Sequence, residues 1–591
     1  MENNEHLSHI RHSLAHLLGA AILELYPGSH ITLGPAIDNG FYYDVDITGK
    51  VTDTDLEKIE KKMKELLKTW TTFEKKILNK EEALKMFKGN VYKEELINGI
   101  VEKGEEITIY TSGNFSDLCR GGHSDNMKEI KDGSWKLDRI AGAYWRGDEK
   151  NKMLTRIYGL AFENKEELDA YLLQQEEARK RDHRKLGKEL KLFTISELVG
   201  AGLPLMQPKG MIIRKEIEDF LWSLHKNKGY NRVWTPHLAK KNLYETSGHA
   251  AKFGNELFRV KGGDEEFFMK PMNCPHHMQI FADNQFSYRD MPVRYFEPAT
   301  VYRYEKAGQL SGLTRVRAIT QDDGHLFCRV SQIGQEVSTI VEIIKSFYTT
   351  MGMMEGYWVR LSTRGDDKSK YLGNDEVWEK AEEALEIAAK ENNLNYKIGR
   401  DEAAFYGPKL DFMFKDAIGR EWQLATIQCD FNLPERFELK FINEKGAEER
   451  PVVIHRAISG SLERFMGVMI EHFAGAFPVW LSPTQVTILP ISEHQKEYAE
   501  SVFKLLKDSD IRVSLDDSNE SLGKRIRNAK MQKVPYVVVI GDKERDASLI
   551  TVEARTPARP LEGAGGEKLE GITTDVFLEK LQKEIKEKTL N

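Results

Sequence analysis

The segment MNCPHHM, residues 272–278, places a cysteine beside two histidines, and both residue types bind metal ions. The adjacent His276 and His277 cannot easily join Cys274 on one ion without a tight turn. Segments far along the chain supply other histidines, His325 in TQDDGHLFC and His455 in VIHRAISGSLERF. Cysteine, histidine and histidine form a zinc set that leaves the fourth position open, as a catalytic or substrate-binding zinc requires. A lone cysteine is more often a packing residue, so the spacing alone leaves both interpretations open.

A second group of residues has the chemistry of an anion site. Arg303 and Glu305 are two apart, which on a strand would point them to the same face. A glycine-containing loop follows, and then the segment RVR, residues 315–317. Arg464 stands at an expected helix start, where the helix dipole also favours an anion. A hairpin with arginines on both arms suits a nucleoside triphosphate, although each arginine alone is more often a surface ion-pair partner.

A third group lies near the N-terminus. His12 and His16 are four apart, which places them on one face of a helix, and Cys119 and His123 are also four apart. On spacing alone, a four-ligand zinc site and a purely structural role both remain open.

The composition describes the molecule that must position these groups. A chain of 591 residues with 40% hydrophobic and 30% charged residues predicts a globular protein of three or four domains. No apolar run is long enough to cross a membrane and no secretion signal opens the chain, so we expect a cytoplasmic protein without membrane partners. Four unclustered cysteines fit a reducing compartment. The net charge of −7 requires any nucleic-acid surface to be local.

Local patterns predict the elements. Residues 40–47 read as a strand, and the basic run 164–193 as a linker helix or helical pair whose charged face is either solvated or contacts phosphates. Residues 210–230 form an amphipathic pattern that leads into a strand ending at Pro236. From about residue 485, strands and helices alternate as β-α-β-α-β, followed by a last helix over 574–588.

These motifs together resemble a known family. The helix and strand ending in Pro236, the Arg303-x-Glu305 loop and Gly460-x-x-Glu463-Arg464 resemble the three motifs of class II aminoacyl-tRNA synthetases. The segments around Cys274, His325 and His455, with FYGPKLDF and WQLATIQCDF, are similar to the threonyl-tRNA synthetase family. The resemblance extends over essentially the whole chain.

The family implies an α+β multidomain fold. We expect an α+β editing domain over 1–163, a helical linker over 164–198, a class II antiparallel-sheet catalytic core over 199–482 and an α/β anticodon-binding domain over 483–591. The implied activity is ATP-dependent ligation of L-threonine to tRNA(Thr) through threonyl-adenylate by a homodimer built across the motif containing Pro236. One Zn²⁺ per subunit and Mg²⁺ with ATP are the implied cofactors.

The resemblance also implies roles for single residues. Cys274, His325 and His455 match the zinc ligands. The substrate-binding positions match Gln321, Asp323, Tyr406, Gln428 and Ser461, where Asp323 receives the threonine hydroxyl. The ATP-binding positions match Arg303, Glu305, Arg315, Gln423 and Arg464. Arg303, Arg464 and Lys409 are the expected catalytic residues, acting through alignment and charge neutralisation.

The N-terminal group matches the editing domain shared by threonyl- and alanyl-tRNA synthetases. The expected editing residues are His12, His16, Lys93, Asp117, Cys119 and His123. Alanyl-type relatives carry zinc at this place, whereas the threonyl type is expected to hydrolyse without it, so these residues are not assigned as metal ligands. Leu14 and Gly122 depart from the usual family pattern, but neither change removes a polar group, so we expect editing to survive.

The C-terminal domain resembles the anticodon-binding domain of related synthetases. Its expected RNA-facing residues are Asn519, Lys524, Arg525, Arg527 and Glu544, although a charged helix face with no RNA role remains an alternative. Glu553 stands where an anticodon-reading arginine is expected. Arg555, two positions on, is a candidate replacement, because on a strand both residues would point to the same face. Bacterial relatives usually begin with a small ubiquitin-like domain; here the sequence starts at the editing segment, either naturally or because it was shortened.

Three functions compete at this stage. Threonine–tRNA ligase activity is the leading hypothesis. A catalytically weak RNA-binding regulator derived from such an enzyme should have lost Arg303, Arg464 or Cys274, and all three are present. A related ligase for proline has little use for the zinc set, and one for serine does not explain the editing-like N-terminal region.

Overall fold

The computed structural model describes residues 2–555 and 568–590, which divide into two compact units, 1–176 and 177–591. The boundary falls inside the helix α5 (Lys165–Arg181), so the expected linker is shared between the units. The finer division into four domains stays a prediction. Among the described residues, no helix is both long and apolar enough to cross a membrane.

The first unit is built around the long helix α1 (Glu2–Leu25), which packs with α2 (Leu56–Leu67) on a mixed-length antiparallel sheet. The sheet order is β1-β3-β8-β7, with β2 paired to β3. The strands are β1 His30–Ile31, β2 Ala36–Ile37, β3 Gly40–Asp46, β7 Trp135–Tyr144 and β8 Met153–Ala161. The expected strand at 40–47 is therefore confirmed. Leu14, one of the two departures from the family pattern, is fully buried in this core.

A smaller layer of the same unit carries part of the N-terminal site. It is a three-stranded antiparallel sheet in the order β4-β5-β6, covered by α3 and α4. The strands are β4 Glu74–Leu78, β5 Ile107–Ser112 and β6 Phe115–Leu118, and the helices are α3 Lys80–Met86 and α4 Val91–Glu102.

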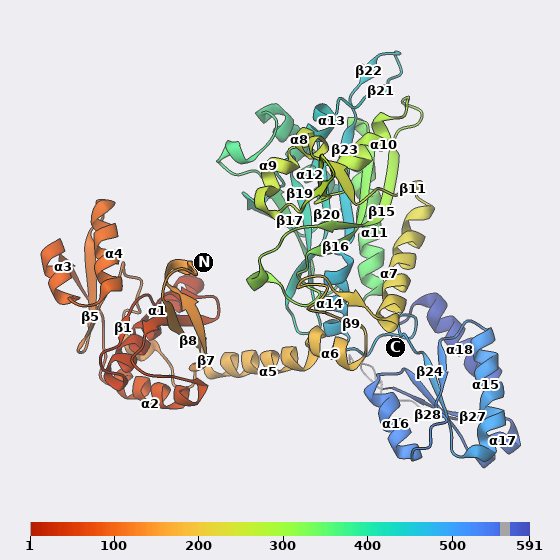
Figure 1. Cartoon of the computed structure of the whole chain (residues 1–591), viewed down its shortest axis with the longest axis horizontal. Coiled ribbons are helices and arrows are strands. Elements are labelled where there is room, and N and C mark those ends of the chain that lie inside the picture. Colours follow the sequence, from red (N-terminus) through yellow and green to blue (C-terminus); the bar gives the residue numbers. More distant parts are fainter. Residues whose placement is uncertain (1, 556–567, 591) are drawn as a thin grey trace. The chain divides into compact units, whose positions relative to one another are not determined.

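The second unit contains an eight-stranded sheet in the order β11-β15-β16-β23-β20-β19-β17-β18 (Figure 1). The pairs are antiparallel except at the two edges, where β11 and β18 lie parallel to their neighbours. In sheet order the bounds are Tyr230–Arg232, Val293–Tyr302, Ala318–Cys328, Val452–Ser461, Glu421–Asp430, Lys409–Lys415, Trp358–Thr363 and Tyr396–Arg400. The central strands are almost continuously buried, because helices and loops cover both faces.

Helices of this unit pack on the sheet and bring site residues to its surface. The amphipathic helix expected at 210–230 is α7, and the basic run forms a helical pair, α5 and α6. The bounds are α6 His183–Glu189, α7 Pro208–Lys226, α8 Lys241–Thr246, α9 His249–Phe253, α10 Cys274–Ala282, α11 Ile333–Thr350, α12 Asp375–Glu391, α13 Asn432–Arg436 and α14 Leu462–His472. Short strands are β9 Phe193–Thr194, β10 Leu205–Met206, β12 Leu238–Lys240, β13 Arg259–Gly262, β14 Glu265–Met269, β21 Phe441–Ile442 and β22 Glu448–Glu449.

The C-terminal part confirms the expected alternation and extends it. Strands β24 (Val486–Pro490), β25 (Val513–Leu515) and β26 (Tyr536–Ile540) are parallel and are joined through α15 (Lys496–Asp508) and α16 (Leu522–Met531). Two further antiparallel strands follow, β27 (Ile550–Ala554), which contains Glu553 of the expected strand, and β28 (Lys568–Ile572), which the sequence patterns did not indicate. Helices α17 (Asp542–Ala547) and α18 (Thr574–Glu587) complete this part.

Candidate active site

Sheet register gathers four residues that are far apart in the sequence into one row. His325 on β16 pairs with His455 on β23, His455 pairs with Gln428 on β20, and Gln428 pairs with Lys409 on β19. Paired residues of antiparallel strands point to the same face, so these four side chains share one surface of the sheet. Asp323 and Gln321 alternate with His325 along β16 and join the same face.

Cys274 is brought to this row by α10, which it opens directly before Pro275. The ligand atoms of Cys274, His325 and His455 all lie within 4.8 Å of one another, and all three residues are buried. Nδ1 of His455 is buried without a hydrogen-bond partner in the described part of the chain. A buried thiol, two imidazoles and an unpaired ring nitrogen fit the donor set that zinc prefers.

The surroundings of this cluster are acidic, which also suits a cation. Burial, followed by the charges of Asp323 and Asp430, raises the pKa of the Cys274 thiol well above its usual range. Asp323 is held by Asn273, whose Nδ2 donates to Oδ2 over 2.7 Å. A bound cation would offset this electrostatic penalty and favour the thiolate.

Two carboxylates, Asp430 and Glu297, orient the candidate ligand histidines, and no pattern in the sequence indicated either of them. Nε2 of His455 lies 2.8 Å from Oδ2 of Asp430. Nδ1 of His325 lies 2.7 Å from Nδ1 of His277, whose Nε2 lies 3.0 Å from Oε2 of Glu297. His277 is three residues after Cys274 on α10, so a C-x-x-H spacing on one helix face was the available signal.

The arginine-bearing hairpin is formed by β15 and β16, which pair up to Tyr302 and Ala318. The expectation that Arg303 and Glu305 lie on a strand is wrong, because β15 ends at Tyr302 and both residues belong to the loop that follows. The two sides of the hairpin are instead joined through side chains, since Arg315 Nε donates to Glu305 over 2.8 Å. The Arg303 guanidinium lies 4.9 Å from the ring centre of Phe253, and burial lowers its pKa.

The start of α14 confirms the expected helix at Arg464. Ser461 caps the helix and accepts a hydrogen bond from the Arg464 amide, and Arg464 Nε donates to the Thr314 carbonyl over 3.0 Å. Gly460 has φ +70°, and a side chain there would meet the Leu424 carbonyl at 2.7 Å, so only glycine fits this turn. The buried Asp322 carboxylate accepts bonds from the amides of residues 458, 459 and 460 and so shapes the turn.

The remaining expected substrate and ATP residues lie around the same face. Tyr406 donates to Gln428, and its ring stacks 4.8 Å from that of His455. Gln423 Nε2 and Lys409 Nζ both contact Asp411, at 2.8 and 3.0 Å. The Gln321 Oε1 atom is buried without a partner among the described residues.

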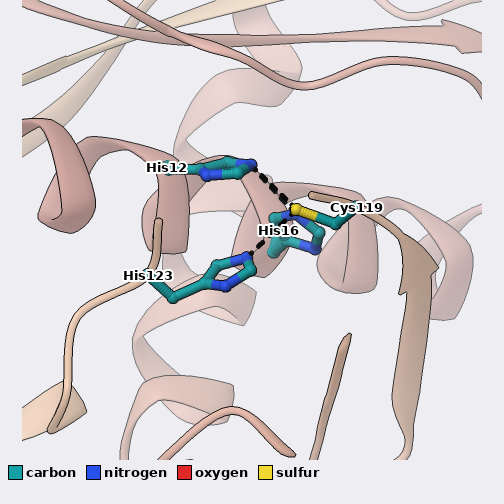
Figure 2. Close-up of side chains that lie close together, drawn as sticks. All are labelled: His12, His16, Cys119 and His123. Atoms are coloured by element: carbon teal, nitrogen blue, oxygen red, sulfur yellow. Dashed lines mark hydrogen bonds between the residues drawn. The ribbon is translucent and has the colours of Figure 1, made fainter. Parts of the chain in front are cut away.

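The N-terminal cluster forms a second, separate arrangement within the first unit. Figure 2 shows His12 and His16 from α1 turned toward Cys119 and His123. Cys119 Sγ lies 3.5 Å from His12 Nε2 and 3.6 Å from His123 Nε2, and all four ligand atoms lie within 4.8 Å of one another. The two pairs recognised by spacing are therefore brought together.

A cavity of about 590 Å³ opens beside this cluster. It is lined by five of the expected editing residues: His12, His16, Lys93, Asp117 and Cys119. Lys93 and Asp117 form a buried ion pair of 2.5 Å. Gly122 has φ +83°, a conformation that glycine favours, and its carbonyl accepts a hydrogen bond from His12 Nδ1.

Burial sets the protonation of the cluster. It lowers the pKa of His123 to about 2, assisted by His16 and His12, and also lowers the pKa values of His12 and His16. Burial raises the pKa of Cys119 to about 11. Near neutral pH the three imidazoles are neutral bases and the thiol is protonated, so Cys119 is poorly suited to act as a nucleophile.

The expected RNA-facing residues do not all face solvent. Asn519, Lys524 and Arg527 are exposed. Arg525 departs from the expectation, because it is buried and donates to the carbonyl of Asp516 over 2.9 Å. Glu544 accepts bonds from Gly541 N and Thr551 Oγ1 and so stabilises α17.

Arg555 is not placed to replace the missing arginine at position 553. It lies beyond the end of β27, and its guanidinium bonds the carbonyls of Lys533, Ala476 and Phe477. Glu553 instead pairs with Lys530 at 2.6 Å.

Comparisons with known families match three parts of the chain. Residues 258–473 match the tRNA synthetase class II core domain (G, H, P, S and T), and residues 485–587 match an anticodon binding domain. Residues 107–158 match the threonyl and alanyl tRNA synthetase second additional domain. The antiparallel sheet, its motif residues and these companion domains define a class II aminoacyl-tRNA synthetase.

Whole-chain relatives narrow the assignment. A threonine–tRNA ligase of Porphyromonas gingivalis is 49% identical over 97% of this chain and 87% of its own length. A threonine–tRNA ligase of Flavobacterium johnsoniae is 49% identical over 92% of this chain and 84% of its own length. The chain therefore belongs to the threonine–tRNA ligase family, and its substrates are tRNA, ATP and an amino acid.

Solved structures agree with this assignment. A structure described as the RNA binding domain of threonyl-tRNA synthetase from Cryptosporidium parvum has a TM-score of 0.63 and 36% identity, covering 68% of this chain and 98% of that one. A structure described as a putative threonyl-tRNA synthetase from Aeropyrum pernix has a TM-score of 0.59 and 30% identity, and the match covers 70% of this chain and 97% of that one.

Proposed function

We propose that this enzyme joins L-threonine to tRNA(Thr) through threonyl-adenylate, with Zn²⁺ held by Cys274, His325 and His455, and that its N-terminal unit hydrolyses seryl-tRNA(Thr). The observation that carries the proposal is the convergence of these three buried ligands beside Asp323 on one face of the sheet. A zinc ion held by these three residues would supply a Lewis acid that attracts the amino and hydroxyl groups of threonine.

The protein's own groups select and orient the amino acid. Asp323, fixed by Asn273, accepts the threonine hydroxyl, while Gln321 and Tyr406 contact the amino group. Gln428 and Ser461 complete the substrate site. Valine has nearly the shape of threonine but lacks the hydroxyl. A site built around a hydroxyl can reject such an analogue by about 10⁴–10⁵-fold, because its buried polar groups are left unpaired.

The arginines serve the nucleotide. Arg303 binds the α-phosphate and the threonine carboxylate at the point of attack. Arg464, in the first turn of α14, binds ATP near the N-terminus of that helix. Glu305, Arg315 and Gln423 hold ATP, whose Mg²⁺ neutralises phosphate charge, and Lys409 contributes a further cation. The carboxylate oxygen attacks the α-phosphorus and pyrophosphate leaves. A terminal ribose hydroxyl of tRNA then attacks the acyl carbon, loses its proton, and AMP leaves. Alignment and charge neutralisation carry both steps.

Editing is needed because the synthetic site cannot fully exclude serine. Serine keeps the hydroxyl and lacks one methyl group, a difference worth only about 10–200-fold. The cavity beside His12, His16 and Cys119 would admit the seryl ester, with the neutral imidazoles accepting a proton from water and the Lys93–Asp117 pair binding polar groups of the substrate.

tRNA binding and assembly complete the proposal. Asn519, Lys524 and Arg527 contact the anticodon stem-loop, whereas Arg525 and Glu544 shape the surface from within their domain. Two copies associate across the segment containing Pro236. There Trp234 is 75% exposed, an unusual exposure for a large apolar side chain.

The first experiment measures ATP–pyrophosphate exchange with threonine, serine, valine and proline, before and after zinc removal. Strong exchange with threonine, weaker exchange with serine and near-background exchange with valine and proline are expected, all lost with the metal. Exchange that survives complete metal removal would contradict the zinc role. No exchange with any amino acid at full zinc occupancy would favour the RNA-binding regulator instead.

Replacing His277 with alanine is expected to weaken zinc binding by about 10–100-fold, because the imidazole connects His325 to Glu297 and fixes the ring nitrogen that faces the metal. Competition with a chelator of known affinity measures this directly. His276→Ala is the matched control, since His276 is the neighbouring residue and its ring nitrogens have no hydrogen-bond partner among the described residues. Equal zinc affinity in both variants would remove His277 from the site.

A further inference from the structure

One buried histidine has no part in either site described so far. His183 is the first residue of α6, in the segment that follows the long helix α5. Its backbone amide and its ring Nδ1 both lie near Glu471 Oε1, at 3.0 and 2.6 Å, and Glu471 belongs to α14. Its ring Nε2 accepts a hydrogen bond of 3.0 Å from the amide of Leu313. The ring therefore links three segments that are far apart in the sequence.

The bonding pattern sets the tautomer. A nitrogen that accepts the Leu313 N–H carries no proton, so the ring proton is on Nδ1 and is donated to Glu471. The second oxygen of Glu471 is bound by Arg420. Burial alone would raise the pKa of Glu471, but the bonds from His183 and the charge of Arg420 outweigh burial and lower it. Although Asp182, His183 and Glu471 lie close together, both ring nitrogens of His183 are engaged, which argues against a metal site.

Two glycines border the His183 ring and the loop that it contacts. Gly312 has φ +49°, and a side-chain carbon there would lie 2.1 Å from His183 Nε2. On α14, a side-chain carbon at Gly467 would lie 3.1 Å from Thr314 Cγ2 and 3.6 Å from the His183 ring. The loop can approach the imidazole this closely only because Gly312 has no side chain, whereas a side chain at Gly467 would crowd Thr314 of the loop rather than the ring.

The residues after Leu313 belong to the proposed ATP site. The Thr314 carbonyl accepts the bond from Arg464, and Arg315 pairs with Glu305. The turn is closed by the amides of Thr314 and Arg315, which both donate to the Ser311 carbonyl. His183 thus bonds the loop at Leu313, Arg464 bonds it at the next residue, Thr314, and Arg315 follows directly.

We propose that His183 is a positioning residue for ATP, which fixes the loop carrying Arg315 by accepting the Leu313 amide while Glu471 holds the ring. The helical segment after α5 is then part of the synthetic site's framework. This inference rests on the proposed role of Arg315 in ATP binding.

A set of substitutions separates the two bonds of the ring. In His183→Asn the short side chain can still donate to Glu471 but does not reach Leu313, whereas in His183→Gln the longer side chain places an acceptor near the position of Nε2. His183→Phe keeps a ring and removes both nitrogens. We expect His183→Asn and His183→Phe to raise the KM for ATP roughly five- to tenfold in pyrophosphate exchange, as the loss of one buried hydrogen bond predicts. The KM for threonine should stay within about twofold, and His183→Gln should restore most of the ATP affinity.

An Arg315 variant separates the proposed role of His183 from the ATP-binding role of Arg315 on which it rests. Arg315→Ala should raise the KM for ATP by itself. If it does and the His183 variants keep the normal value, His183 is only structural and the inference is overturned, even where thermal stability falls. If Arg315→Ala leaves the KM for ATP unchanged, the proposed role of Arg315 is wrong and the inference falls with it. Equal effects of His183→Asn and His183→Gln would also overturn it, because the acceptor would not matter. Should His183→Asn fail to fold, His183→Phe carries the same comparison.

Discussion

Cys274→Ala should remove zinc from the catalytic core and reduce threonine-dependent pyrophosphate exchange by roughly 10³-fold, since loss of a metal's charge stabilisation costs several kcal/mol and each 1.36 kcal/mol is about tenfold in rate. Among the residues that the structure describes, the cluster has three candidate ligands, and the thiol of Cys274 is the one cysteine among them. Metal content by mass spectrometry and exchange kinetics measure the two effects on one preparation.

Cys328→Ala is the matched control. Cys328 is equally buried and lies on β16, three residues beyond His325, but belongs to the hydrophobic core rather than to the ligand cluster. It should keep its zinc and nearly all of its exchange activity, with at most a modest loss of stability. If both variants lose activity to the same extent, or if Cys274→Ala retains zinc, the ligand assignment is wrong.

His12→Ala should reduce hydrolysis of seryl-tRNA(Thr) by about 10²–10⁴-fold, the range expected when a positioned acid–base group is lost. His12 lines the cavity, bonds the Gly122 carbonyl and lies 3.5 Å from Cys119. Threonine-dependent exchange should stay unchanged, because the synthetic residues belong to the other unit of the chain. The measurement is deacylation of seryl-tRNA(Thr) prepared in advance, together with accumulation of seryl-tRNA(Thr) during charging with serine.

His6→Ala is the control for this result, since His6 is on the same helix with a side chain that is 44% exposed. Unchanged hydrolysis in His12→Ala would contradict the editing role. Zinc stoichiometry adds a second test: one zinc per chain agrees with the assignment, whereas two, falling to one in His12→Ala, would show that the N-terminal cluster binds metal.

Residue types and spacing carried much of the prediction. The long segments around Cys274, His325 and His455 identified the family, and the relatives confirm it. Local patterns located α7, α14 and the β-α-β-α-β part of the C-terminal region, because amphipathic periodicity and capping are properties of neighbouring residues. The hairpin strand was extended too far past Tyr302, and β28 gave no recognisable pattern, since short strands owe their stability to pairing partners.

The sequence by itself determined which side chains are available and which short elements carry them: the metal-binding types, the motif arginines and the two histidine-bearing segments near the N-terminus. Only the tertiary structure decided which of them meet. Sheet register sets His325 opposite His455, 130 positions away, and α10 brings His277 and Cys274 to the same place. Burial removed Arg525 from the solvent-facing surface, backbone carbonyls hold the guanidinium of Arg555, and packing placed His183 between α14 and the arginine loop. These outcomes depend on long-range packing, in which each contact joins residues that local propensity does not couple.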